Sequence, residues 1–376
     1  MGAAVACFLA RDHDMAPIVI ERDPTYRRAS SALSASSIRQ QFSTPINIAL
    51  SRASLEFYRR IGTELEVAGQ RPEIGLVEPG YLYLAGSAGA AMLREQHALQ
   101  RRMGVEVALL DPSALVARFP WLSVESVVLG SVGLSGEGWF DGWSVLQAFR
   151  RKAIACGARF VQAEAHALET RDGRVAAVSC EDGQRFTADE VVVAAGAWSA
   201  SLLAPLGTDL PVRPRKRDVF VFDAPVRLPQ APLLIDPSGT WFRPEGGRYI
   251  AGAPPRGEDV DEPPLEAIDH GLFEQVIWPA LAHRVPAFEA LRLVNAWAGY
   301  YEMNTFDQNG LVGLLPGWHN LRVACGFSGH GMQQAPAIGQ ALAGHIASGR
   351  WGEIDLAPLS PARIARREPI VEHCII

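Results

Sequence analysis

The chain has 376 residues, of which 48% are hydrophobic and 20% are charged, so it can bury substantial cores and is long enough for two domains. Its formal charge of -6 shows no basic excess, which argues against nucleic acid as a partner and leaves no source for electrostatic attachment to a membrane. One local basic run, residues 213–217, is an exception.

Targeting and redox signals are few. No apolar stretch reaches the roughly 18 residues that a membrane helix needs, and the first residues lack the basic start of a signal peptide, so we expect no transmembrane segment and a cytoplasmic location. The cysteines form no CxxC pair, which argues against a metal site or a disulfide framework. They are Cys7, Cys156, Cys180, Cys325 and Cys374.

The first part of the chain predicts a helix followed by a parallel strand. Residues 2–10 are small and apolar, which is typical of a helix packed tightly on a sheet, and residues 17–20 indicate a short buried strand ending at Glu21. Residues 30–37, rich in serine and alanine, are expected to form a loop. Residues 47–62 have the apolar spacing of a helix.

The middle of the chain alternates helices and strands. Residues 74–85 predict a strand pair turning at a Pro-Gly step, and residues 90–103 predict a charged surface helix. Asp111 precedes another helix, and Asp141 is the expected N-cap of a helix that ends at Gly157. Four further strands are predicted at residues 158–163, 165–170, 174–180 and 189–195.

A second, largely antiparallel sheet is predicted between residues 212 and 300. Its strands are expected at residues 212–222, 240–242, 249–252 and 292–300. The proline-rich residues 228–237 and 254–264 are expected to form loops of this sheet.

The segment Gly326 to Gly331, GFSGHG, contains three glycines within six residues and is followed by a helix of small residues. Glycines let the backbone approach a ligand closely, and the helix start directs N–H groups and its positive dipole end at an electron-rich or anionic group. This pattern predicts a cofactor cradle. The alternative interpretation is a glycine-rich turn beside a C-terminal helix.

Two further segments favour a dinucleotide fold. Glu21 lies 19 positions after Gly2, the spacing at which such folds place an acid on the ribose hydroxyls, although an exposed glutamate after a strand is the alternative. If Gly2 is the last glycine of a GxGxxG turn, the first strand would precede residue 1, so we expect Met1 to be an internal methionine and the natural chain to begin about ten residues earlier. Residues 194–199 form a small-residue turn directly after an apolar strand, where doubly wound sheets deliver ligands.

These segments together resemble the FAD-dependent oxidoreductases of the D-amino-acid oxidase class. The resemblance rests on MGAAVACFLA, IVIERD, SSALSASSIRQQF, VVVAAGAWS and GFSGHGMQQAPAIG, and it covers almost the whole chain. It is strongest to the FAD-dependent oxidoreductase domain-containing proteins and more distant to sarcosine and glycine oxidases. It implies an α/β fold, with a Rossmann-like FAD-binding domain and an α+β substrate domain built on a mainly antiparallel sheet. The implied FAD-binding domain comprises residues 1–75, 137–211 and 301–376, and the substrate domain residues 76–136 and 212–300.

The resemblance also implies which residues hold FAD. Gly2 and Glu21 would serve the adenosine end with Arg22 beside it, and Ala165 or its neighbour His166 would offer backbone groups to the adenine. The pyrophosphate and the flavin would be approached by Ser30, Ser31, Ser36 and Ser37, with Arg39 near the isoalloxazine. Beside the cofactor and along the flavin ring the implied residues are Ala195, Gly196, Trp198, Gly326, Ser328, Gly329, His330, Gly331 and Met332.

The implied reaction is oxidation of a C–N bond in a small amine or a D- or N-substituted amino acid, with hydride passing to flavin N5. Such a site needs a cation for a substrate carboxylate and a tyrosine or histidine to orient the amine. Arg39, Tyr301 and His330 are the catalytic candidates, with Tyr300 behind them. A structural role is the alternative for each.

Three departures from the sarcosine oxidases refine this expectation. Gly299 stands where those enzymes attach flavin to a cysteine, which predicts noncovalent FAD, and Gln333 replaces a lysine that pairs with carboxylate. Ile250 lies near the position of the lysine that promotes reaction with oxygen, which favours a dehydrogenase with an electron acceptor other than O2. The alternative function is a flavin-fold assembly or interaction protein with little or no turnover, and a third reading is a folded remnant without cofactor.

Overall fold

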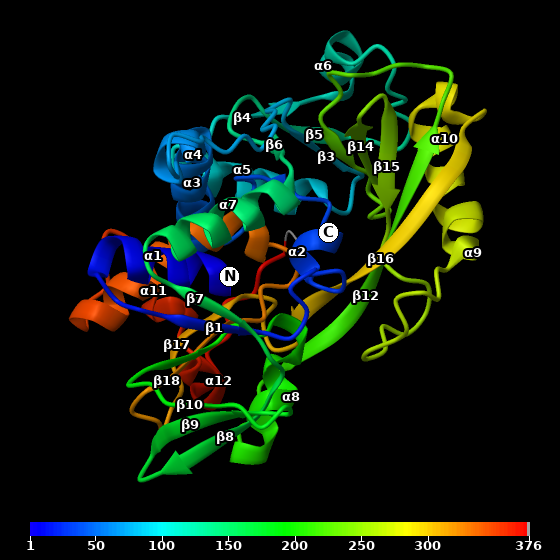
Figure 1. The fold of residues 1–376 in the computed structure, drawn as a ribbon. Helices are drawn as coiled ribbons and strands as arrows, with labels where there is room; N and C mark the ends of the chain where they lie inside the picture. Colours follow the sequence, from blue (N-terminus) through cyan, green and yellow to red (C-terminus); the bar gives the residue numbers. More distant parts are fainter. Residues whose placement is uncertain (374–376) are drawn as a thin grey trace.

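A computed structural model of the protein describes residues 1–373 and shows a parallel sheet in two pieces (Figure 1). β1 (Ile18–Glu21) pairs in parallel with β7 (Arg159–Gln162). β11 (Val191–Val193) pairs in parallel with β18 (Leu321–Cys325), and β18 pairs antiparallel with β17 (Leu311–Leu314). The predicted helix-then-parallel-strand order is confirmed, whereas β1 is only partly buried, because Ile18 at its start is exposed.

Four helices pack together beside this sheet. They are α1 (Gly2–His13), α3 (Pro45–Arg59), α7 (Gly142–Ala155) and α11 (Gly331–Ser348). The small residues of α1 and α11 allow a very close approach, since a Cβ added to Gly339 would lie 2.9 Å from the Cβ of Ala4. Small residues are therefore needed where α1 and α11 meet.

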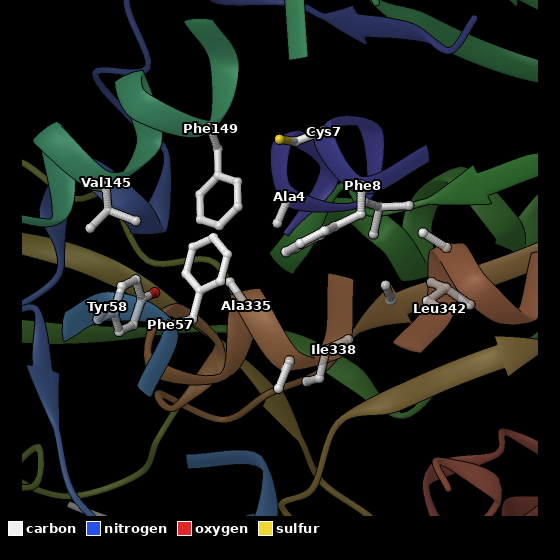
Figure 2. Close-up of a cluster of buried hydrophobic side chains, with 14 of the residues drawn as sticks. Ala4, Cys7, Phe8, Phe57, Tyr58, Val145, Phe149, Ala335, Ile338 and Leu342 are labelled. Carbon is white, nitrogen blue, oxygen red and sulfur yellow. The ribbon is translucent and has the colours of Figure 1, made fainter. Parts of the chain in front are cut away.

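The core between these helices is aromatic (Figure 2). The rings of Phe57 and Phe149 stack with centroids 5.5 Å apart, and Phe8 meets Phe57 edge-on at 5.6 Å. All three side chains are buried, so this cluster joins α1, α3 and α7 into one rigid unit beneath the parallel strands.

The second sheet has eight strands and is antiparallel except where β13 pairs with β3, which confirms the predicted antiparallel character. In sheet order they are β16 (Arg292–Asn304), β12 (Val212–Asp223), β15 (Arg248–Gly252), β14 (Trp241–Glu245), β13 (Leu233–Ile235), β3 (Tyr81–Ala85), β5 (Leu129–Gly133) and β4 (Val107–Leu110). β12 and β16 are the longest strands and extend as a ribbon from this sheet toward the first (Figure 1). This ribbon therefore links the two sheets.

Apart from α5, which has 13 residues, the remaining helices are short. The helices are α2 (Ser30–Leu33), α4 (Ile61–Glu64), α5 (Ala90–Arg102), α6 (Pro112–Arg118), α8 (Ser199–Leu203), α9 (His270–Leu272), α10 (Trp278–Arg284) and α12 (Ala362–Arg366). Two small antiparallel sheets join β2 (Ser37–Ile38) to β6 (Gly138–Trp139), and β8 (Ala165–Arg171) to β9 (Arg174–Cys180) and β10 (Arg185–Phe186).

Local capping signals are confirmed. The Asp141 side chain accepts hydrogen bonds from the backbone N–H groups of Trp143 and Ser144, and the Asp111 side chain accepts one from Ala114. Both aspartates therefore begin helices α7 and α6 as their positions predict.

Three local expectations are wrong. Residues 30–37 are not a plain loop: they form α2 and the start of β2, because the Ser30 hydroxyl donates to the Tyr300 carbonyl and ties this segment to β16. Residues 74–85 form no hairpin, since β3 finds its partners in β13 and β5. Residues 228–237 contain β13, which is held by pairing on both edges although its sequence neighbours are prolines.

No helix within residues 1–373 combines the length and the apolar character needed to cross a membrane. Across the same residues, no cluster of three His, Cys, Asp or Glu side chains could hold a metal ion. Cys374 lies outside the described residues, and the other four cysteines are free thiols. The proposed division into two domains stays a prediction, although the large hydrophobic clusters beneath the two sheets draw on different parts of the chain.

Candidate active site

A cavity lies where three distant segments of the chain meet. Its wall is formed by residues 30–37, residues 299–302 at the end of β16, and the glycine-rich turn with the start of α11, residues 327–335. Including its open mouth, the cavity encloses about 1400 Å³. α2 contacts β16 along one side of it (Figure 1). The ends of the two sheets thus surround one space, as ligand sites at domain junctions commonly do.

The cavity collects many of the predicted site residues. Those in its wall are Ser30, Ser31, Ser36, Ser37, Arg39, Tyr301, Ser328, Gly329, Gly331 and Met332. Those outside its wall are Gly2, Glu21, Arg22, Ala165, Ala195, Gly196, Trp198, Gly326 and His330. The structure therefore brings the serine segment, Arg39, Tyr301 and most of the glycine-rich turn into one wall, and leaves the adenosine-end candidates and the turn at residues 195–198 outside it.

The glycine-rich turn forms a cradle that side chains would fill. Gly329 has φ +90°, and a Cβ at this position would lie 2.4 Å from the Tyr301 ring. α11 begins at Gly331 with no side-chain cap and no acidic residue in its first turn, so its N–H groups and positive dipole end are available to a ligand. These features fit the electron-rich cofactor that the sequence predicts.

Arg39 is a buried cation in the cavity wall. Its Nη1 donates to the Gln41 carbonyl at 3.0 Å and also to the Tyr83 hydroxyl, and its guanidinium lies 4.1 Å from the Phe42 ring centroid. The backbone N–H of Arg39 donates to Gln333 Oε1 at 2.9 Å, which connects it to α11. Packing and hydrogen bonds thus hold this charge at a fixed place, as binding of a carboxylate requires.

Tyr301 lies between Arg39 and a second cation, Arg217, that sequence reasoning missed. The Arg217 guanidinium sits 5.3 Å from the centre of the Tyr301 ring and is paired with both carboxylate oxygens of Asp259, at 3.0 and 2.9 Å. Burial raises the pKa of Tyr301, while the charges of Arg217 and Arg39 act in the opposite direction. The tyrosine is therefore a neutral donor near pH 7 beside two positive charges.

His330 lies next to the cavity wall. Its two neighbours Gly329 and Gly331 line the cavity, but its own buried ring packs edge-on against Phe42, with centroids 5.4 Å apart. Burial lowers the pKa of His330 to about 4, and the nearby charge of Arg39 acts in the same direction. Neither ring nitrogen has a hydrogen-bond partner among the described residues. His330 is thus a buried, neutral side chain that does not line the cavity, and its catalytic role stays a prediction.

Glu302 is the second residue that sequence reasoning missed. Its side chain lines the cavity, and Oε2 accepts a hydrogen bond from the Gly326 N–H at 2.9 Å. Burial raises the pKa of Glu302 to about 7. The usable signal in the sequence was a carboxylate directly after two tyrosines, two positions past the end of the strand predicted at residues 292–300.

The predicted adenosine-end residues lie near one another outside the cavity. The Arg22 guanidinium lies 4.0 Å from the Trp198 ring centroid and 3.3 Å from Glu164. Glu21 accepts a hydrogen bond from the Asp23 N–H at 2.9 Å, and burial raises the pKa of Glu21. Their role in binding the adenosine part therefore stays a prediction.

The predicted cofactor residues Gly2 and Gly196 are closely packed at the edge of the parallel sheet. A Cβ added to Gly2 would lie 3.6 Å from the Ala194 Cβ, and one added to Gly196 would lie 3.8 Å from Glu302 Oε2. Ala195 directly precedes the short 3-10 turn of Gly196–Trp198, and Ala165 begins β8. Gly2 and Gly196 therefore border the same region as Glu302.

Comparison with known proteins identifies the family. Residues 1–345 match the family model described as FAD dependent oxidoreductase, DAO. The chain is 41% identical to FAD-dependent oxidoreductase domain-containing protein 1 of Xenopus laevis over 413 aligned positions, which cover 100% of this chain and 83% of that protein.

Two solved structures show the same fold. Glycine oxidase from Geobacillus kaustophilus has a TM-score of 0.80 at 26% identity, covering 96% of this chain and 95% of that one. L-proline dehydrogenase from P. horikoshii has a TM-score of 0.85 at 24% identity, covering 98% and 96%. The predicted α/β fold and family are thereby confirmed. The chain belongs to the DAO family of FAD-dependent oxidoreductases, whose cofactor is FAD.

Proposed function

We propose that the protein oxidises the C–N bond of a small amine, or of a D- or N-substituted amino acid, using noncovalently bound FAD. The observation that carries this proposal is the meeting of Arg39, Arg217 and Tyr301 in one cavity with the glycine-rich turn. Relatives named glycine oxidase and L-proline dehydrogenase support amino acids as the substrate class.

The roles of the side chains follow from their charges and positions. When bound, FAD supplies the hydride acceptor. Arg39 and Arg217 attract the substrate carboxylate, and the Tyr301 hydroxyl donates to it or orients the amine. Because Arg39 is buried and fixed by packing, the substrate carbon is held in one orientation at little entropic cost.

The cavity wall supports noncovalent attachment of FAD. Gly299 has no room for a side chain, since a Cβ there would lie 2.9 Å from the Leu33 Cβ. Within residues 1–373, no cysteine lines the cavity. We therefore expect acid-denatured protein to release its flavin.

The absence of a lysine from the described part of the wall favours a dehydrogenase over an oxidase. Ile250 is buried in β15 and lies outside the cavity, and in the described part of the wall there is no lysine. The charge of Arg217 is opposed by Asp259. The site thus lacks the lysine that would favour one-electron transfer to O2, and another electron acceptor is expected.

The test is anaerobic titration of the purified yellow protein with a panel of amines that includes sarcosine, glycine, L-proline and D-alanine. We expect at least one amine to bleach the flavin absorbance, and the reduced protein to reoxidise faster with an artificial acceptor than with air. Tyr301→Phe should keep the flavin spectrum but slow reduction roughly 100-fold, the usual scale for loss of a positioned donor.

Tyr249→Phe is the matched control, because Tyr249 is a buried, hydrogen-bonded tyrosine in the core beneath the second sheet, away from the cavity. Flavin that no amine reduces would reject the enzymatic proposal and favour an assembly or interaction protein. Reoxidation by air as fast as by the artificial acceptor would reject only the dehydrogenase assignment.

A further inference from the structure

Glu302 reaches from the substrate sheet into the edge of the parallel sheet. It is near the end of β16, directly after Tyr301, and its side chain accepts the Gly326 N–H at 2.9 Å. Its own carbonyl accepts the N–H of Ser328 at 3.2 Å. The glycine-rich turn is therefore fastened to Glu302 through both its side chain and its backbone.

The surroundings of this carboxyl group resemble those of a dinucleotide-binding site. Gly326 follows β18 and Gly196 follows β11, and these parallel strands present their carboxyl ends at one edge. A Cβ on Gly196 would lie 3.8 Å from Glu302 Oε2, and Met1, at the start of α1, lines the same cavity. In open α/β sheets, ligands bind at this edge and their phosphates are held by helix N-termini.

A carboxylate at this position would repel the phosphates of a dinucleotide unless it carried a proton. Burial raises the pKa of Glu302 to about 7, so the proton is available near neutral pH. The amino group of Met1 in the sequence given, whose own pKa burial lowers, acts against this rise in the pKa of Glu302. The Glu302 charge in turn, together with burial, raises the pKa of the neighbouring Cys325 thiol. A neutral thiol does not compensate an ionised Glu302.

We propose that Glu302 belongs to the cofactor site, that it faces the anionic part of FAD in its protonated form, and that binding of FAD is coupled to uptake of one proton by this carboxyl group. This inference depends on one part of the proposed function, namely that FAD binds in this cavity. It assigns to Glu302 a role as a proton-bearing cofactor ligand.

The sign of the pH dependence follows from this coupling. Below about pH 7 the carboxyl group is protonated with or without FAD, so the affinity for FAD is constant. Above this pH the free protein has lost the proton and must regain it to bind FAD. The dissociation constant should then rise by up to about tenfold per pH unit.

The experiment is titration of cofactor-free protein with FAD between pH 6 and pH 9, followed by flavin fluorescence, together with calorimetry at pH 8 in buffers of different ionisation enthalpy. Wild-type protein should show the rise in dissociation constant and an uptake approaching one proton per FAD. Glu302→Gln, which keeps a neutral side chain of the same shape, should bind FAD with a nearly constant dissociation constant and take up no proton. Glu95→Gln removes an exposed glutamate on α5 and should behave as wild type.

Three outcomes would each contradict a different claim. A wild-type affinity that is constant from pH 6 to pH 9 would overturn the coupling, and this measurement does not depend on how well the variant folds. Proton uptake that persists in Glu302→Gln would assign the proton to another group and overturn the role of Glu302. Failure of the wild-type protein to bind FAD at any pH would instead reject the proposed function.

Discussion

The direction of single side chains decides the chemistry of this cavity. Tyr300 and Tyr301 both line it, but the Tyr300 hydroxyl donates to the Pro263 carbonyl, whereas Tyr301 lies beside Arg217 and Gly329. Adjacent residues of a strand ordinarily point to opposite faces of the sheet, yet both of these tyrosines line the cavity. Tyr301 is left as the tyrosine suited to contact substrate.

Gly329→Ala should damage the site through one contact. At φ +90° an added Cβ would lie 2.4 Å from the Tyr301 ring, so the ring or the turn must move. We expect a loss of roughly 2–4 kcal/mol in stability, from the strained backbone together with overpacking, and slower reduction of flavin by substrate. Urea unfolding and anaerobic reduction kinetics measure the two effects.

Gly183→Ala provides the matched control, since Gly183 has φ +83° with no atom within 4 Å of the added Cβ. It should show only the backbone cost of roughly 1 kcal/mol and normal reduction kinetics. If the two variants lost the same stability and reduced flavin at the same rate, the contact with Tyr301 would contribute to neither.

At the scale of elements, the start of α7 positions the serine segment of the cavity. Asp141 caps this helix, and the preceding residue, Phe140, donates its N–H to the Ser36 carbonyl at 2.9 Å. Gly142 packs so closely that a Cβ there would lie 2.3 Å from Ser36 Oγ. The helix start that Asp141 caps therefore helps to position Ser36 in the cavity wall.

Asp141→Ala should lower the free energy of unfolding by about 1 kcal/mol, because two backbone N–H groups lose their acceptor. Asp141→Asn keeps an acceptor oxygen and should restore most of the loss. Urea denaturation of the cofactor-free protein measures both. An asparagine variant as unstable as the alanine variant would show that the negative charge, rather than the cap, is what matters.

At the scale of the whole molecule, the cavity joins the two sheets. β12 and β16 pair along twelve residues of β12, from Val212 to Asp223, and their continuous ribbon contributes Arg217 and Tyr301 to the wall (Figure 1). The α2 segment and the α11 start complete it from the other side. A ligand in this space contacts both parts at once and should stabilise their arrangement.

FAD should therefore raise the stability of the whole chain. At a free concentration of 100 times its dissociation constant, it should add about 2.7 kcal/mol to the free energy of unfolding. Urea denaturation followed by circular dichroism measures the shift, and NAD at the same concentration serves as a dinucleotide without a flavin. An equal shift with NAD would indicate binding of the adenosine part alone.

Much of this molecule was predictable from local patterns. The small residues of α1, the Asp141 cap, the strands β12, β14, β15 and β16, and the GFSGHG turn are all encoded by neighbours in the chain, whose spacing reports helix, strand or close backbone approach. Together with the family resemblance, these patterns sufficed for the α/β fold, the family and FAD.

The orientation of the site residues was not predictable in this way. Ser30, Arg217, Glu302 and His330 come from segments that meet only after folding, and each side chain points where long-range packing sends it. The placement of the His330 ring could not be predicted, because the turn around it has no helical or strand period that would indicate the direction of a side chain. The folded chain thus adds Arg217 and Glu302 to the residues that line the cavity and leaves His330 out of the lining, because contacts between distant residues outweigh local preference there.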